Sequence, residues 1–313
     1  MNNYKVVFMG TPDYSVPVLK GLIDNYNVIG VVTQPDKEVG RGHEVVFSPI
    51  KKVALENNIS VVQPEKIRDD YNSVLELKPD IIVTCAYGQI IPKEILDYPK
   101  YGCINVHASL LPKYRGGAPI HRAILNGEKK TGITIMYMAP GMDDGDIISQ
   151  EEVEIRDDET VGELHDVLSN LGAELLLKTL PSIFEGTNKR IKQDETKVTL
   201  AKIIKKEEEV IDFNDSSINI YNKVRGLNPY PGAYTILDNK RIKIYKARIE
   251  SNSSNMKPGT IIDVLKDGIV VKTGDGSVVI EVLKIEGKKE MNAREFLNGI
   301  KGDTLIGKEF QKE

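Results

Sequence analysis

The sequence has 313 residues, enough for two domains that each bury a core, and it is 40% hydrophobic and 28% charged. It contains no run of about 18 apolar residues and no signal-peptide pattern at its start, so we expect a cytoplasmic protein without a membrane span. Its two cysteines, Cys85 and Cys103, lie in apolar runs, which indicates buried thiols in a reducing compartment rather than a zinc site.

The net charge of −4 is divided unevenly along the chain. Residues 1–188 hold 18 Lys and Arg against 27 Asp and Glu, a balance of −9. Residues 189–313 hold 24 against 19, a balance of +5. The basic second part permits a polyanion such as a nucleic acid to approach from one side, although solvated surface charge alone also produces such a division.

The first half of the chain predicts strands and helices that alternate around a mostly parallel sheet. Buried strands are expected at residues 5–10, 28–32, 59–62, 81–85, 103–107, 131–138 and 147–155. Helices are expected at residues 15–24, 48–57 and 118–126, and from residue 160 to about residue 186. This pattern is typical of a doubly wound, Rossmann-like α/β domain. The first turn, Gly10-Thr11-Pro12-Asp13, lacks the later glycines of a dinucleotide fingerprint, which argues against an NAD-dependent enzyme.

A long polar segment at residues 33–48 interrupts this pattern and is predicted as a loop, either functional or disordered. Ser48 and Pro49 end it, since a Ser at the cap and a Pro at the first helical position are typical of a helix start. Thr160 and Glu163 likewise form a capping box before the last helix of this domain.

The second part of the chain differs in pattern from the first domain, which we place at residues 1–188. Residues 189–209 are polar and basic and are predicted as a linker, followed by a carboxyl-terminal domain at residues 210–313. A helix is expected there at residues 216–224, and short strands at residues 234–237, 242–247, 259–264, 268–273 and 277–285. Five short strands with turns between them predict a small, open, OB-like β-barrel.

Chemistry-bearing residues gather in two stretches of the first domain. Asn105-Val106-His107-Ala108-Ser109-Leu110-Leu111-Pro112 begins in a predicted strand and continues into Arg115-Gly116-Gly117-Ala118-Pro119. Gly141-Met142-Asp143-Asp144-Gly145-Asp146-Ile147 lies between two later strands. Alternation places Asn105 and His107 on one face at the carboxyl end of a strand, where open α/β sheets hold ligands. Taken alone, however, this pair is explained more simply as a core histidine and a turn asparagine.

Together these stretches resemble the folate-dependent formyltransferases, which carry Asn-x-His-x-Ser-Leu-Leu-Pro, Arg-Gly-x-x-Pro and Met-Asp-x-Gly-Asp motifs. Along most of the chain the resemblance is to the members of that family that act on transfer RNA. It implies Asn105, His107 and Asp143 as catalytic residues, and 10-formyltetrahydrofolate as the co-substrate, with no metal. The residues that it implies for folate binding are Tyr87, Gly88, Gln89, Ile90, Ser109, Leu110, Leu111 and Pro112.

The resemblance also implies initiator methionyl-tRNA as the partner, bound by an enzyme that we expect to be a monomer. In that family a basic insertion reaches the acceptor end of the RNA, and residues 33–48 resemble it through Lys37 and Arg41. The linker and the predicted barrel add further candidate phosphate contacts: Lys189, Arg190, Lys192, Lys205, Lys206, Arg241 and Lys243.

Formyl transfer to an amine needs a group that stabilises the oxyanion and groups that move a proton. We assign the first role to the amide of Asn105 and the second to His107, with Asp143 orienting the imidazole or holding a water. Two other functions stay open: formylation of a sugar-nucleotide amine or glycinamide ribonucleotide, and a non-catalytic RNA-binding module. The last would not need these three residues together.

Overall fold

A computed structural model describes residues 2–40, 42–251, 254–298 and 304–312. The chain divides into two compact units. The first comprises residues 1–119, 130–153 and 165–201, and the second comprises residues 120–129, 154–164 and 202–313. Within the described residues, no helix is both long and apolar enough to cross a membrane.

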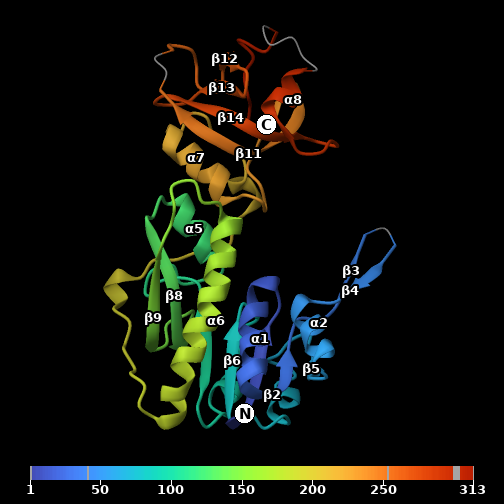
Figure 1. The fold of residues 1–313 in the computed structure, drawn as a ribbon, viewed down its shortest axis with the longest axis vertical. Helices are drawn as coiled ribbons and strands as arrows, with labels where there is room; N and C mark the ends of the chain where they lie inside the picture. The colour runs from blue at the N-terminus through green and yellow to red at the C-terminus, as the bar shows by residue number, and fades with distance from the viewer. Residues whose placement is uncertain (1, 41, 252–253, 299–303, 313) are drawn as a thin grey trace. The chain divides into compact units, whose positions relative to one another are not determined.

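The first unit is built on a seven-stranded sheet with the order β5-β2-β1-β6-β7-β8-β9 (Figure 1). The strands are β1 (Asn2–Gly10), β2 (Tyr26–Val32), β5 (Ser60–Val62), β6 (Ile81–Cys85), β7 (Cys103–His107), β8 (Lys130–Tyr137) and β9 (Ile147–Glu154). The five strands from β5 to β7 pair in parallel, and β8 is antiparallel to β7. The predicted Rossmann-like, mostly parallel sheet is thus confirmed.

Helices cover this sheet, which explains why its central strands are continuous apolar runs. The helices of the chain are α1 (Val16–Asn25), α2 (Pro49–Glu56), α3 (Asn72–Leu75), α4 (Lys93–Leu96), α5 (Pro119–Leu125), α6 (Val161–Glu185), α7 (Ser217–Gly226) and α8 (Ala293–Asn298). Short 3-10 helices occur at Asp13–Ser15, Glu195–Lys197 and Lys206–Glu208. Every residue of β6 is buried, and Val7 and Met9 of β1 share a core cluster with Ile95 of α4.

The predicted helix starts are confirmed by their hydrogen bonds. The Ser48 hydroxyl accepts from the N–H of Lys51, and Pro49 is the first residue of α2. At the start of α6, the backbone N–H and the hydroxyl of Thr160 donate to the Glu163 carboxylate, while the N–H of Glu163 donates to the Thr160 hydroxyl. Each capping side chain satisfies N–H groups that the first helical turn leaves without partners.

Residues 33–48 contain regular structure, so the prediction of an irregular loop is wrong. Strands β3 (Lys37–Val39) and β4 (Glu44–Val46) pair antiparallel, with Lys37 opposite Val46. Valines favour strands even in short polar segments. Gly40, at φ +74°, and His43, at φ +51°, adopt the left-handed backbone that a tight hairpin turn uses.

Residues 189–201 follow α6 and pack along the first unit. Ile191 exchanges two backbone hydrogen bonds with Ile147, at the start of β9. Farther on, the N–H of Arg115 donates to the carbonyl of Thr199, and the N–H of Ala201 donates to the carbonyl of Arg115. The segment is therefore held against both of the stretches that carry the candidate catalytic residues.

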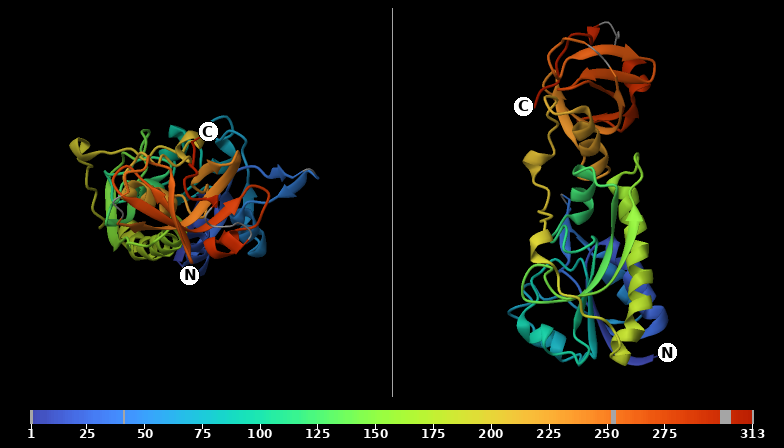
Figure 2. Two further views of the ribbon diagram at one scale, coloured as in Figure 1. Left: turned by 90° about the horizontal axis from the view of Figure 1, so that it is seen from above. Right: turned by 90° about the vertical axis from the view of Figure 1, so that its left-hand side faces the viewer.

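The second unit contains an antiparallel sheet, drawn in orange to red in Figure 2. Its strand order is β10-β11-β14-β13-β12. Its strands are β10 (Tyr234–Leu237), β11 (Lys240–Glu250), β12 (Ile261–Leu265), β13 (Gly268–Lys272) and β14 (Ser277–Ile285), with β15 (Met291–Asn292) beside β14. The carboxyl-terminal segment forms bridges to both ends of this order, Gln311 to Ile236 and Glu309 to Thr260. This arrangement agrees with the predicted OB-like domain.

Candidate active site

The carboxyl ends of three neighbouring strands define one edge of the first sheet. β1 pairs with β2 on one side and with β6 on the other, so the strand order reverses between β1 and β6. Open α/β sheets bind ligands outside the carboxyl ends of their strands at such a reversal. The loops that follow Cys85 of β6 and His107 of β7 begin at this edge.

His107 is the last residue of β7 and is 6% exposed. Its Nε2 lies 3.0 Å from the carbonyl oxygen of Tyr114. Because a carbonyl only accepts, Nε2 carries a hydrogen and donates it. Nδ1 is therefore the nitrogen left for chemistry, and it lies 3.6 Å from Oδ2 of Asp143.

Asp143 lies in the loop between β8 and β9, with its backbone in the left-handed region at φ +49°. Aspartate tolerates that conformation better than most residues do. The N–H of Gly116 donates to Oδ2 at 2.8 Å, so the oxygen that faces His107 is also held by the backbone. The loop packs tightly, since a Cβ on Gly145 would lie 1.9 Å from the carbonyl oxygen of Tyr137.

Asn105 lies on β7, directly beside Thr84 of β6 in the parallel register. The Thr84 hydroxyl donates to Oδ1 of Asn105 at 2.8 Å, which fixes the orientation of the amide. In the described part of the chain, Nδ2 of Asn105 donates to no acceptor. The two Nδ2 hydrogens are thus available to a ligand at this edge of the sheet.

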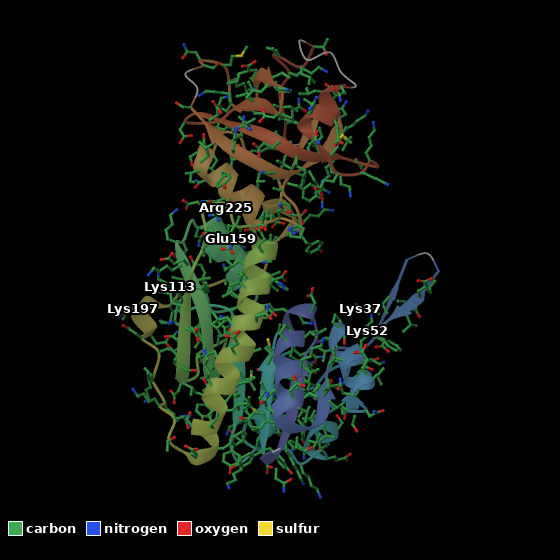
Figure 3. All side chains as sticks on the ribbon, in the orientation of Figure 1. Lys37, Lys52, Lys113, Glu159, Lys197 and Arg225 are labelled. Carbon is green, nitrogen blue, oxygen red and sulfur yellow. The ribbon has the colours of Figure 1, made fainter. Side chains whose placement is uncertain are left out.

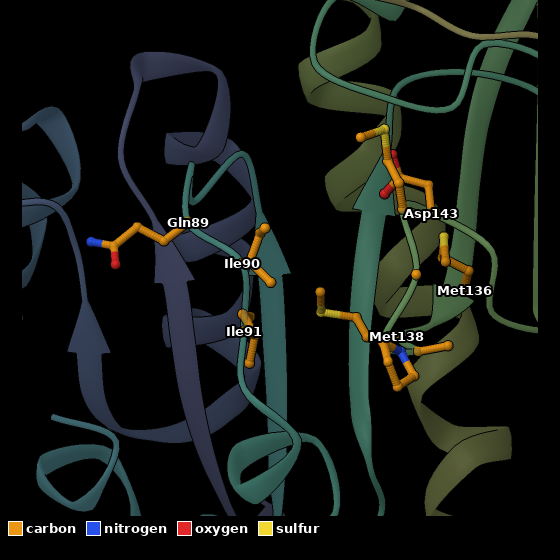
Figure 4. A pocket seen from close by; sticks show the side chains of 10 residues that line it. Gln89, Ile90, Ile91, Met136, Met138 and Asp143 are labelled. Atoms are coloured by element: carbon orange, nitrogen blue, oxygen red, sulfur yellow. The ribbon is translucent and has the colours of Figure 1, made fainter. Parts of the chain in front are cut away.

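A pocket of about 230 Å³ opens beside Asp143 (Figure 4). It is lined by Gln89, Ile90, Ile91, Met136, Met138, Ala139, Pro140, Gly141, Met142 and Asp143. Ile90 and Ile91 face Met138 across it, whereas the side chain of Gln89 points away. Apolar walls with few polar groups suit a flat organic ring.

The segment before this pocket is anchored by Gln89 and Tyr87. Oε1 of Gln89 accepts from the N–H of Ile67 at 2.8 Å. Tyr87 is buried, burial raises the pKa of its phenol, and its hydroxyl has no partner among the described residues. Between them, Gly88 is exposed and has φ +90°. Of the four residues predicted here for folate binding, Gln89 and Ile90 line the pocket.

The other predicted folate segment, residues 109–112, lies along the loop after β7. Ser109 is buried and donates its hydroxyl to the carbonyl of Lys113 at 2.7 Å. Leu111 packs against Met136, which lines the pocket, while Leu110 and Pro112 are half-buried. This segment therefore lies beside the pocket without lining it, and its binding role stays a prediction.

The basic residues predicted to bind RNA in the first unit have different surroundings. Lys37 is exposed on β3 (Figure 3), and Arg41 lies outside the described residues. Lys189 and Lys192 are exposed. Arg190 is occupied, because its guanidinium lies 4.2 Å from the ring centroid of Tyr137 and donates to Asp146.

In the second unit, Lys205 and Lys206 are exposed. The guanidinium of Arg241 stacks on Tyr234, 3.4 Å from the ring centroid, and one of its nitrogens lies 3.4 Å from a Glu209 carboxylate oxygen. The ammonium of Lys243 donates to the carbonyl of Pro231 at 2.6 Å. Arg241 and Lys243 thus already have partners within the fold.

Reasoning from the sequence missed the residues that orient the three polar side chains. Gly116 and Tyr114 act through backbone groups, so their residue types carry little signal, although the Arg-Gly-Gly motif contains Gly116. Thr84 gave no signal because a threonine inside a buried strand is an ordinary β-branched residue.

The comparisons with known proteins agree with this architecture. The formyl transferase family model matches residues 4–180, and the model of the formyl transferase C-terminal domain matches residues 203–301. The chain belongs to the formyl transferase family.

Within that family, the chain is most informatively compared with curated methionyl-tRNA formyltransferases. It is 54% identical to the one from Bacillus cytotoxicus over 95% of this chain and 96% of the relative. It is 52% identical to the one from Bacillus subtilis, over 96% of this chain and 97% of the relative.

Solved structures share the fold at low sequence identity. An N-formyltransferase from Helicobacter canadensis, in complex with folinic acid and dTDP-3-aminofucose, matches with a TM-score of 0.68 at 22% identity, covering 89% of this chain and 99% of that one. A methionyl-tRNA formyltransferase from Clostridium thermocellum matches with a TM-score of 0.56 at 18% identity, covering 90% and 98%.

Proposed function

We propose that this enzyme transfers the formyl group of 10-formyltetrahydrofolate to the free α-amino group of initiator methionyl-tRNA, acting as a monomer in the cytoplasm. The main support is the near-complete coverage of curated methionyl-tRNA formyltransferases at 52% to 54% identity. The site supports it independently, because an amide, an imidazole and a carboxylate come from two neighbouring segments at one sheet edge.

The reaction forms one carbon–nitrogen bond and breaks another. The amine attacks the formyl carbon, the carbonyl electron pair moves to oxygen, and collapse of the tetrahedral intermediate releases the folate nitrogen. The proton that the amine loses goes to that leaving nitrogen. A model α-amino group titrates at about 7.7 to 8.0, so much of the amine is already neutral near physiological pH.

The three residues divide this chemistry among them. Nδ2 of Asn105 donates to the developing oxyanion, a contribution of about 10² to 10³ in rate for such a donor. Nδ1 of His107 moves the proton, since Nε2 is committed to Tyr114. Asp143 orients the imidazole or holds the water that relays the proton.

The pocket beside Asp143 is the proposed position of the folate ring. Ile90, Ile91 and Met138 would pack on its faces, and backbone groups of residues 89–91 would satisfy its polar edge. Residues 87, 88 and 109–112 would bind the folate from beside the pocket. The tRNA would be held by the exposed lysines Lys37, Lys189, Lys192, Lys205 and Lys206, together with Arg41. Arg190, Arg241 and Lys243 would have to exchange their present partners to join them.

A competition assay tests the proposed function. Purified enzyme is given 10-formyltetrahydrofolate and charged initiator methionyl-tRNA, with a sugar-nucleotide amine as competitor. We expect the enzyme to formylate the methionyl-tRNA and to leave the sugar-nucleotide amine unmodified. Preferential formylation of the sugar-nucleotide would instead identify the enzyme as a sugar-nucleotide formyltransferase. RNA binding with no formyl transfer would leave only a binding module.

A further inference from the structure

Gln193 bridges the segment after α6 to the loop that carries Asp143. Its Nε2 donates to the carbonyl oxygen of Asp143 at 2.7 Å and to that of Gly145 at 2.8 Å. Both amide hydrogens are thus spent on backbone carbonyls of the short segment that begins at Asp143. Gln193 is half-buried, and it belongs to residues 189–201 of the first unit.

Arg115 fixes which way this amide points. Its Nε donates to Oε1 of Gln193 at 3.0 Å, so the amide oxygen is satisfied and the nitrogen must face the two carbonyls. The other end of the guanidinium makes a two-point contact with Glu195, at 3.2 and 2.7 Å. Arg115 is 6% exposed, and the N–H of the next residue, Gly116, donates to Oδ2 of Asp143.

The Asp143 loop needs such support because its backbone is in an unfavourable region. At φ +49° an aspartate is less favoured than in the right-handed or extended regions, although it tolerates the left-handed region better than most residues do. Here the carboxylate is held by Gly116, and the backbone at Asp143 and Gly145 is held by Gln193. These contacts together set the 3.6 Å separation between Asp143 Oδ2 and His107 Nδ1.

We propose that Gln193 is a positioning residue for formyl transfer, which acts by holding the Asp143 loop at its working distance from His107. The inference rests on the proposed function. Gln193 contacts neither His107 nor the Asp143 carboxylate, so its effect passes through the position of the Asp143 loop and of Arg115, which precedes Gly116. A displacement of about 1 Å at a reacting group can cost about 10²-fold in rate.

Three substitutions at Gln193 separate positioning from simple stability. Gln193→Ala removes both donors, and Gln193→Glu keeps the shape but presents oxygen to two carbonyl oxygens. Gln193→Asn keeps the amide and shortens its reach, so it should rescue part of the activity. Asp194→Ala is the matched control, because the neighbouring Asp194 caps the Glu195–Lys197 turn through Thr196 and does not contact the Asp143 loop.

The deciding measurement is a double-mutant cycle with Asp143→Ala, using steady-state formylation of methionyl-tRNA with each substrate varied in turn. We expect Gln193→Ala and Gln193→Glu to lower kcat by about 10-fold to 100-fold, with KM for both substrates within about twofold of wild type. In the Asp143→Ala background, the same substitutions should cost less than about twofold. Asp194→Ala should leave kcat within about twofold.

Several outcomes would overturn the inference. One is that the Gln193 substitutions lower kcat by the same factor in the wild-type and the Asp143→Ala backgrounds. Another is that kcat stays within about twofold of wild type for both Gln193→Ala and Gln193→Glu. If Gln193→Ala does not fold, the isosteric Gln193→Glu and the melting temperature of each variant carry the test alone. A wild-type enzyme that formylates no methionyl-tRNA would refute the proposed function instead, which is a different result.

Discussion

His107 donates its Nε2 hydrogen to the backbone carbonyl of Tyr114 at 3.0 Å, and this single contact decides which imidazole nitrogen faces Asp143. A carbonyl partner at Nε2 selects the tautomer of the neutral ring in which Nδ1 carries no hydrogen. Nδ1 is therefore the ring nitrogen that can accept a proton during the proposed transfer.

The first prediction concerns this pair. His107→Ala and Asp143→Ala should each lower kcat by about 10² to 10⁴, the usual contribution of general acid–base groups. Steady-state formylation kinetics provide the measurement, with circular dichroism to show that each variant is folded. If both variants keep turnover within about threefold of wild type, the catalytic assignment is wrong.

The second prediction concerns Thr84, whose hydroxyl orients the Asn105 amide. Thr84→Val keeps the shape and removes the donor, so the amide can rotate. We expect kcat to fall by about tenfold, less than the roughly 10² to 10³ expected from removing an oxyanion donor altogether. Thr84→Ser should keep near wild-type activity, and equal activity of the Val and Ser variants would refute the role.

The third prediction concerns Gly116, which has φ +120° and whose Cβ, if present, would lie 2.8 Å from the carbonyl oxygen of Ala201. Gly116→Ala should destabilise the fold by about 1 to 3 kcal/mol and also lower kcat, because its N–H holds Asp143. Urea unfolding measures the first effect. Gly42→Ala is the control, since a Cβ there meets nothing closer than 4.0 Å, and an equal effect of both changes would contradict the prediction.

The fourth prediction is a pH dependence in the second unit. Hydrogen bonds from Arg122 lower the pKa of Glu208 from 4.5 to about 2. Because the folded-state pKa is lowered, this pair stabilises the fold above about pH 4.5, and that contribution is lost as the pH falls toward about 2. The unfolding free energies of wild type and Glu208→Gln should therefore converge over this range. A difference between the two unfolding free energies that stays constant with pH would contradict the assignment. The contribution of the pair to stability is small, because the Glu208 side chain is 35% exposed.

The fifth prediction concerns the exposed lysines that we propose as RNA contacts. Lys189→Ala combined with Lys192→Ala should weaken tRNA binding and reduce the slope of log affinity against log salt by about 1 for each lost phosphate contact. Filter binding across a salt series measures the slope. Lys20→Ala combined with Lys178→Ala removes two exposed charges from α1 and α6, and should leave the slope unchanged. Equal slopes for the two double variants would reject the assignment.

Much of the fold follows from short-range pattern. The apolar runs that become β6 and β7 match the predicted boundaries, and the caps at Ser48 and Thr160 begin helices as expected. The β3–β4 hairpin was missed because its three-residue strands are too short for alternation to be distinguished from an irregular loop.

The candidate site was only partly accessible to the same reasoning. Asn105 and His107 are two positions apart on one strand, so local periodicity places them, and the family motif supplies Asp143. The contacts that orient them join residues distant in sequence, such as Gln193 with Asp143, 50 positions apart. No local sequence pattern marks such contacts, because at least one partner in each is a backbone carbonyl or amide, which every residue type can supply.

One short segment of chain pairs with both outer edges of the second sheet. Gln311 forms a bridge to Ile236 in β10, and Glu309 forms a bridge to Thr260, just before β12. Unpaired outer strands are templates on which other molecules add strands and aggregate. We therefore expect residues 307–311 to protect the second sheet against self-association, so substitutions that remove these bridges should promote oligomers that grow with concentration, even if the first unit remained fully folded.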